Sequence, residues 1–292
     1  MTNKIKSGII SVVGRTNAGK STLVNKILGE KVSIVSPVAQ TTRAVVRGVL
    51  TDGRGQLVLL DTPGLHKSRS LLTSTMNKRA RAASEGTDAV LLVVDASVPP
   101  QLEDEGWMAR LAKSDVPAVL ALNKADKADR GAEYVKAWAK QCGADKNVCA
   151  TFPVSATTGE GVDALVAKLF ELLPEGEPLF DSETLSDYPR KLAIADIVRE
   201  RFCLALKDEI PHSIGIIIES ANDAEINATV VVKRQSHKGI VIGKGGKLIK
   251  DIQKSAAKEI ISAYGGGASV SLRVKVEPGW DENPKILGQM GL

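Results

Sequence analysis

Cysteine and histidine are scarce in this chain of 292 residues, which contains three of each. The cysteines Cys142, Cys149 and Cys203 form no Cys-x-x-Cys pair and have no histidine at the spacing of a zinc ligand. Zinc modules and disulfide-stapled secreted domains depend on such spacings, so the sequence argues against both. This pattern favours the reducing environment of the cytoplasm.

Long apolar runs are missing as well. The run Ala89 to Val94 stops at Asp95, far short of the ~20 residues that a membrane-spanning helix needs. The segment from Met1 to Lys6 leads into a strand too short for a signal peptide and offers no cleavage site. We therefore expect a soluble, cytoplasmic protein.

Internal repeats and low-complexity tracts are absent, while apolar residues make up 43% of the chain, enough for two compact domains. The helical pattern of 162–172 is broken by Leu173-Pro174-Glu175-Gly176-Glu177-Pro178. Prolines and glycine in such a cluster indicate a linker. We predict domains at 1–173 and 190–292, joined by a linker at 174–189.

A phosphate-binding loop stands near the N-terminus. Residues 14–21 match G-x-x-x-x-G-K-[ST] in full, between a strand at 9–13 and a helix at 22–28. The loop's N–H groups would face phosphate oxygens, Lys20 would reach the β- and γ-phosphates, and Ser21 would hold Mg²⁺. The predicted nucleotide-binding residues here are Gly14, Arg15, Thr16, Asn17, Ala18, Gly19, Lys20, Ser21 and Thr22.

A second motif indicates which nucleotide base is bound. Asn123-Lys124-Ala125-Asp126 follows the apolar run 116–122, and ligands bind at the carboxyl ends of parallel strands. The Asp126 carboxylate would accept both the ring N–H and the exocyclic amino group of guanine, a donor pair that adenine lacks. Asn123 would brace the loop, and the Lys124 stem would lie along the base. Residues Ser155, Ala156 and Thr157, after the segment 148–154, would close over it.

A third motif, Asp61-Thr62-Pro63-Gly64, follows the strand 57–60 and a hairpin across 52–55. Asp61 would bind Mg²⁺ through water, and the Gly64 N–H would meet the γ-phosphate. A threonine of Gln40-Thr41-Thr42-Arg43 would complete the Mg²⁺ shell. The choice between Thr41 and Thr42 stays open, with Thr42 favoured, so the predicted metal ligands are Ser21, Thr42 and Asp61.

In this order the motifs resemble the translation-factor-related GTPases over residues 5 to 173, whereas other P-loop ATPases lack the guanine tetrad. Ras-like enzymes place a glutamine after the last glycine of Asp-x-x-Gly, where this chain has Leu65. His66 could be offered as a base but is more often a loop residue. The resemblance implies that Asn17 places K⁺ against the phosphates, with a structural Asn as the rival interpretation. We expect slow turnover, with Asn17, Lys20, Thr42, Asp61 and Gly64 as catalytic groups.

The second half has a different pattern, with helices at 190–206 and 247–264 and strands at 213–220, 226–234 and 269–276. A Gly-x-x-Gly turn between helices clamps a nucleic-acid backbone, lysines supply attraction, and isoleucines supply a groove for bases. No aromatic residue stands nearby, so the stacking platforms of oligonucleotide-binding barrels are not expected. Single-stranded RNA is favoured over duplex DNA. The predicted RNA-binding residues are Lys238, Gly239, Ile240, Val241, Ile242, Gly243, Lys244, Gly245, Gly246 and Lys247. The net charge of +5 suits an acidic partner.

These motifs together resemble the Era family, bacterial ribosome-assembly GTPases with a C-terminal KH domain of the second type. The resemblance implies an α/β, mostly parallel P-loop domain with helices on both faces, then an α+β KH domain. It also implies GTP and Mg²⁺ as cofactors, with K⁺ as a further one, binding of the small-subunit rRNA 3′ end and the 30S subunit, a monomer, and peripheral contact with the inner membrane. Ala39 departs from the family's proline before Gln40-Thr41-Thr42-Arg43.

Three alternatives remain. A different Era-related GTPase with two GTPase domains is disfavoured by the single phosphate loop. An RNA-binding checkpoint module with a binding-only GTP switch gains weight from Leu65. An unrelated ATPase predicts that ATP competes with GTP, which Asp126 argues against.

Overall fold

The computed structural model describes residues 5–36, 38, 41–64, 70–127, 130–142, 148–265 and 269–292. Its contacts separate two compact units. The first comprises the described residues of 1–33, 42–67 and 76–187, and the second those of 34–41, 68–75 and 188–292. Each unit has its own hydrophobic core.

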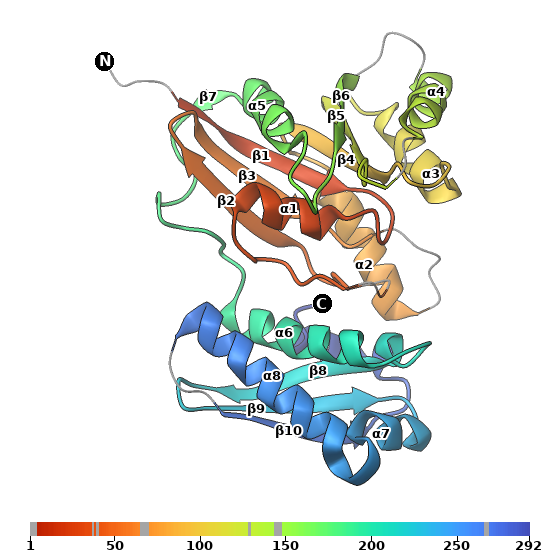
Figure 1. Cartoon of the computed structure of the whole chain (residues 1–292), viewed down its shortest axis with the longest axis vertical. Helices are drawn as coiled ribbons and strands as arrows, with labels where there is room; N and C mark the ends of the chain where they lie inside the picture. The colour runs from red at the N-terminus through yellow and green to blue at the C-terminus, as the bar shows by residue number, and fades with distance from the viewer. Residues whose placement is uncertain are drawn as a thin grey trace. The chain divides into compact units, whose positions relative to one another are not determined.

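The first unit is built on one sheet in the strand order β2-β3-β1-β4-β5-β6 (Figure 1). The strands are β1 (Ile5–Val13), β2 (Val46–Asp52), β3 (Gly55–Asp61), β4 (Ala89–Asp95), β5 (Ala118–Asn123) and β6 (Val148–Val154). All neighbours from β3 to β6 pair in parallel, and β2 is antiparallel to β3. The expected hairpin is present, because Asp52 pairs with Gly55.

Helices cover both faces of this sheet (Figure 1). They are α1 (Lys20–Leu28), α3 (Leu102–Leu111), α4 (Gly131–Cys142) and α5 (Val162–Leu172). A further helix, α2 (Leu71–Ala82), has residues 71–75 in the second unit and 76–82 in the first. The helices α1 and α5 pack on one face, and α3 and α4 bury Trp107 and Tyr134 on the other. Successive residues of β4 alternate between the two cores, so the strand is apolar until Asp95. The predicted α/β fold is confirmed.

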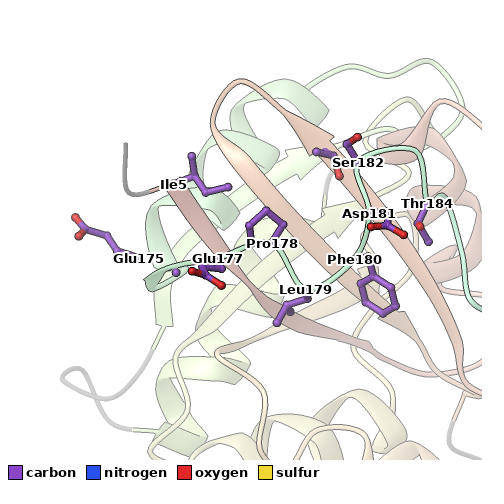
Figure 2. Close-up of a pocket in the computed structure, with 11 residues that line it drawn as sticks. Ile5, Glu175, Glu177, Pro178, Leu179, Phe180, Asp181, Ser182 and Thr184 are labelled. Carbon is purple, nitrogen blue, oxygen red and sulfur yellow. The ribbon is translucent and has the colours of Figure 1, made fainter. Parts of the chain in front are cut away.

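The chain after α5 lies along the first unit. Its first residues form β7 (Glu175–Gly176), which pairs antiparallel with β1. The buried Gln56 side chain accepts N–H bonds from Leu179 at 2.7 Å and Phe180 at 2.9 Å, and donates to the Phe180 carbonyl at 2.9 Å. Figure 2 shows the pocket, of 1040 Å³, that this segment lines beside β1. The residues expected to form a linker therefore belong to the first unit as far as Asp187.

The second unit contains a three-stranded sheet in the order β10-β9-β8, covered by helices. Its main elements are α6 (Arg190–Ala205), β8 (Ile214–Ala221), β9 (Glu225–Val232), α7 (Gln235–Ile242), α8 (Lys247–Tyr264) and β10 (Ser269–Val276). Apolar side chains of α6 and α8 pack on the inner face of the sheet. On β10 the valines and leucine point inward, while Arg273 and its alternating neighbours are exposed.

The order of elements in this unit, α-β-β-α-α-β, agrees with the expected KH fold, and β10 runs parallel to β9 while β8 runs antiparallel. The chain then closes with a 3-10 helix (Trp280–Glu282) and α9 (Pro284–Gln289). Gly265 ends α8, and residues 266–268 lie outside the described residues. None of the helices in the described ranges combines the length and apolar character needed to cross a bilayer.

Candidate nucleotide-binding site and nucleic-acid interface

The phosphate loop joins β1 to α1 and depends on glycine at two close approaches. A Cβ at Gly14 would lie 2.2 Å from the Val93 carbonyl oxygen, and one at Gly19 would lie 2.2 Å from Asn123 Nδ2. Both glycines also have left-handed φ angles, of 147° and 94°. Asn17 has a φ of 61°, a conformation that asparagine tolerates better than most residues. The loop backbone therefore packs directly against β4 and the guanine motif, with no room for a side chain at either glycine.

Lys20 is buried at the first turn of α1. Its ammonium donates to the loop's own carbonyls, at 3.2 Å to Gly14 and 3.0 Å to Arg15. Burial lowers the pKa of Lys20 to about 8, although the nearby Asp61 carboxylate opposes this shift. An anionic phosphate in the loop would favour the charged form and restore a higher pKa.

Three oxygen-bearing side chains from separate segments meet at the end of β3. Ser21 Oγ donates to Asp61 Oδ2 at 2.6 Å and lies 2.8 Å from Thr42 Oγ1. Asp61 is fully buried, and its Oδ1 has no hydrogen-bond partner in the described part of the chain. Burial raises the pKa of Asp61, with the Ser21 hydrogen bond and Lys20 opposing it. Hydroxyl and carboxylate oxygens with a spare acceptor suit a hard divalent cation such as Mg²⁺.

The Thr41 hydroxyl has other partners, which belong to the second unit. Its Oγ1 donates to the Val38 carbonyl at 2.6 Å and lies 2.7 Å from Ser36 Oγ. The geometry therefore supports Thr42 as the threonine beside Ser21 and Asp61. Gln40 and Ala39 of the same motif lie outside the described residues.

The Asp-Thr-Pro-Gly motif begins at the carboxyl end of β3. Thr62 Oγ1 donates to the Val12 carbonyl at 2.7 Å, which fixes the start of the loop beside β1. A Cβ at Gly64 would lie 2.6 Å from the Thr16 nitrogen, so Gly64 comes directly against the phosphate loop. Leu65 and His66, on which the catalytic-water hypothesis depends, lie outside the described residues.

Asn123 joins the guanine motif to two other loops. Its Nδ2 donates to the Ala18 carbonyl at 2.8 Å, and its Oδ1 accepts from the Ala156 N–H at 3.0 Å. This one buried amide thus positions both the phosphate loop and the Ser155-Ala156-Thr157 segment. Asp126 is exposed, and no described residue donates a hydrogen bond to its carboxylate. The arrangement leaves that carboxylate available to a base.

Two carboxylates that sequence reasoning did not assign also stand at this edge. Asp95 ends β4, and its Oδ2 lies 2.6 Å from Lys124 Nζ and 3.5 Å from Arg15 Nη2. The buried Asp104 of α3 accepts from Arg15 Nε at 3.1 Å. Asp104 also caps its own helix, because its carboxylate accepts the Gln101 N–H. In the sequence it therefore resembles any acidic residue in the first turn of a helix. Asp95 ends a parallel strand, at the edge of the sheet where ligands bind, and this position in the sequence could have identified it as a site residue.

The Gly-x-x-Gly turn lies between α7 and α8. Gly243, Gly245 and Gly246 all have φ between 60° and 75°, and nothing lies within 4 Å of a Cβ placed at Gly245. This open backbone admits the close approach of a sugar or phosphate. Exposed or half-buried lysines flank the turn and continue along α8, namely Lys238 on α7 and then Lys244, Lys247, Lys250, Lys254 and Lys258.

The apolar part of this face is smaller than expected. Ile240 is 48% exposed, whereas Val241 is fully buried in the core and Ile242 packs against it. The expectation that Val241 contacts bases is therefore corrected. Val241 follows the buried His237 by four residues, so both lie on the inner side of α7.

Family models match both halves of the chain. A family model described as "50S ribosome-binding GTPase" matches residues 9–124, and a KH domain model matches 209–281. GTPase Era of Carboxydothermus hydrogenoformans is 38% identical, covering 94% of each chain, and that of a Geobacter species is 38% identical, covering 99% of this chain and 98% of its own.

Two solved structures also match over nearly the full length of the chain. A variant of Aquifex aeolicus Era bound to GDP·AlF4⁻ has a TM-score of 0.92 at 33% identity, covering 98% of this chain and 99% of that one. A structure of Era with MgGDPNP and nucleotides 1506–1542 of 16S ribosomal RNA matches with the same values. The chain therefore belongs to the Era family of GTPases, guanine-nucleotide enzymes with a C-terminal KH domain.

Proposed function

We propose that this chain is a GTP-controlled switch that binds the 3′ end of 16S rRNA and promotes assembly and maturation of the 30S subunit. The observation that carries the proposal is the presence in one chain of the Ser21–Asp61–Thr42 cluster and an open glycine turn lined with lysines. The Era complex with nucleotides 1506–1542 of 16S rRNA supports the choice of RNA.

At the nucleotide site each residue has a separate task in this proposal. Ser21 and Thr42 would bind Mg²⁺ directly and Asp61 would bind it through water, which neutralises charge on the β- and γ-phosphates. Lys20 would exchange its carbonyl partners for phosphate oxygens. The Gly64 N–H would face the γ-phosphate, and Asp126 would accept the guanine donors.

Hydrolysis needs charge at the phosphates as well as a positioned water. We propose that Lys20 and a K⁺ held beside Asn17 supply this charge. The left-handed φ of 61° at Asn17 supports a constrained loop position, which is the least that ion binding needs. Turnover in K⁺ but not in Na⁺, lost in Asn17→Ala, would separate this role from that of a structural asparagine.

Coupling to the RNA face is proposed to run through the segment 34–41, which belongs to the second unit. In that unit the Val35 N–H donates to Glu200 Oε1 at 2.7 Å, and Arg199 donates to the Thr41 carbonyl. Both α6 side chains are nearly fully buried. The next residue in the chain is Thr42, so an order imposed on Thr42 by GTP and Mg²⁺ would reach α6 through this segment.

The RNA proposal is tested with a charge reversal that should not weaken the fold. Lys247 is the first residue of α8, a helix with no acidic residue in its first turn. Lys247→Glu should stabilise the helix by about 0.3–1 kcal/mol because a negative charge suits a helix N-terminus. It should nevertheless weaken binding of a 16S 3′-end oligonucleotide in an anisotropy titration. Lys191→Glu, an equal charge change on α6, is the matched control, and equal loss in both variants would contradict a site at the glycine turn.

A further inference from the structure

Asp95 is the common partner of the phosphate loop and the guanine loop. Its Oδ2 lies 2.6 Å from Lys124 Nζ and 3.5 Å from Arg15 Nη2. The other oxygen, Oδ1, accepts the Ser97 N–H at 3.1 Å and the Ser97 hydroxyl at 2.5 Å. One carboxylate, fixed by its own turn, therefore bonds Lys124 of the guanine loop and lies within ion-pair distance of Arg15 of the phosphate loop, whose Nη2 is buried and makes no hydrogen bond in the described part of the chain.

The carboxylate is rigidly placed. Asp95 pairs with Asn123 in the register of β4 and β5, and the Ala96 N–H donates to the Asn123 carbonyl at 2.8 Å. Burial alone would raise the pKa of Asp95, but hydrogen bonds from Lys124 and Ser97 outweigh it and lower that pKa. The side chain is thus held as an anion, hydrogen-bonded to Lys124 and facing the Arg15 guanidinium at ion-pair distance.

Arg15 is held from a second side. Its Nε donates to Asp104 Oδ2 at 3.1 Å, and the same oxygen accepts from Gln101 N and the Tyr134 hydroxyl. Asp104 has no exposed surface, whereas the Arg15 side chain is 17% exposed. Arg15 therefore points away from solvent, into the wall formed by α3 and β4, and it fixes the second residue of the phosphate loop there.

Lys124 also needs an anchor. It is one of three described non-glycine residues with positive φ, at 66°, a conformation that costs free energy unless its surroundings impose it. A lysine stem that lies along a base loses side-chain freedom on binding, unless its end is already fixed. The ion pair with Asp95 fixes that end in advance and so lowers the cost of binding the base.

We propose that Asp95 is a positioning and specificity-determining residue that couples guanine recognition by Lys124 and Asp126 to the position of the phosphate loop at Arg15. Arg15 then influences base selectivity although it belongs to the phosphate loop. The inference rests on the proposal that Asp126 and Lys124 hold the guanine base.

The test compares GDP with inosine 5′-diphosphate, which keeps the ring N–H but lacks the exocyclic amino group. Dissociation constants of both nucleotides are measured by calorimetry for the full chain and four variants. Wild type should prefer GDP by about tenfold or more, because a hydrogen bond to a charged acceptor is lost with inosine. Arg15→Met and Asp95→Asn should each reduce this preference by at least about threefold, as coupled sites do. Arg110→Met, which breaks only the surface pair with Glu85, should leave it unchanged.

A purely structural role gives a different pattern. If Arg15→Met weakens both nucleotides by the same factor and keeps the wild-type preference, Arg15 acts on the phosphates alone and the coupling is refuted. Arg15→Lys keeps the charge but not the fork that reaches two carboxylates, so it should give an intermediate preference should Arg15→Met fail to fold. A wild type without preference for GDP would instead refute the proposed base site itself.

Discussion

Ser21 and Asp61 form a 2.6 Å hydrogen bond across the end of the sheet, and the second Asp61 oxygen has no partner among the described residues. Ser21 lies in the first turn of α1, and Asp61 is the last residue of β3. Both positions are fixed by backbone hydrogen bonds, so the pair is preorganised for a cation rather than assembled by it.

The two neighbouring threonines give a matched test of this cluster. Thr42→Ala removes a ligand beside Ser21 and should lower Mg²⁺-dependent affinity for a GTP analogue about 10–100-fold. Thr41→Ala removes a hydroxyl that bonds Val38 instead and should keep that affinity. Titration of the analogue at several Mg²⁺ concentrations measures both. A larger loss in Thr41→Ala would reverse the assignment.

Nucleotide affinity should fall as pH rises above 8. Lys20 has a pKa of about 8 without nucleotide because it is buried, and phosphate raises that pKa in the complex. Binding therefore takes up a proton above pH 8, and between pH 7 and pH 8.5 the dissociation constant of GDP should rise about fourfold. Calorimetry in buffers of different ionisation enthalpy measures the proton uptake directly. An affinity unchanged over this range would show that Lys20 is fully charged in the free protein.

Trp280 should help to position α7, one of the two helices that flank the proposed RNA-binding turn. Its indole N–H donates to the Ser213 carbonyl at 3.1 Å, and Ser213 Oγ lies 3.0 Å from His237 Nδ1 on α7. The Ser213 proton is committed to the Ile210 carbonyl, so His237 is the donor in this pair.

Trp280→Phe leaves a buried carbonyl unpaired and should lower the free energy of unfolding by about 1–3 kcal/mol. We expect weaker RNA binding with unchanged GDP affinity, because the first unit is untouched. Denaturant unfolding and an RNA titration, both on the full chain, measure the two effects. Unchanged RNA binding by the folded variant would show that this network does not position α7.

Glu200 should make RNA affinity depend on which nucleotide is bound. Glu200→Ala removes the acceptor of the Val35 N–H, so the ratio of RNA affinities in a GTP analogue and in GDP should approach one. GDP affinity itself should stay within about twofold, since Glu200 belongs to the second unit. Glu219→Ala, on the exposed part of β8, serves as control. A ratio kept by Glu200→Ala would place the coupling elsewhere.

Strong periodicity was enough to predict many elements from the sequence. The bounds of α5, α8 and β10 agree with the expected ranges, because each has a clear helical or alternating pattern between glycine or proline breaks. The nucleotide motifs were found because they are local. Each needs a fixed backbone shape within a few residues, and that requirement is visible in glycine positions such as Gly14 and Gly19.

The misses involve contacts between residues distant in sequence. Gln56 looks like a polar interruption of a strand, but its amide hydrogen-bonds the segment after α5, for which proline and glycine indicated only a linker. Asp95 and Arg15 lie far apart in the sequence, so only the fold shows that they meet. Val241 was placed on the surface with its neighbours, since three apolar residues in a row on a helix do not reveal which one faces inward.

Hydrolysis of GTP with and without RNA tests the central claim most directly. The account predicts that an oligonucleotide matching the 16S rRNA 3′ end accelerates GTP hydrolysis, and that Lys247→Glu loses this acceleration while keeping the basal rate. ATP should not replace GTP, because adenine lacks the pair of N–H donors that the Asp126 carboxylate would accept from guanine. A basal rate indifferent to the RNA, together with no RNA binding in a titration, would contradict the account and leave a GTPase with another partner.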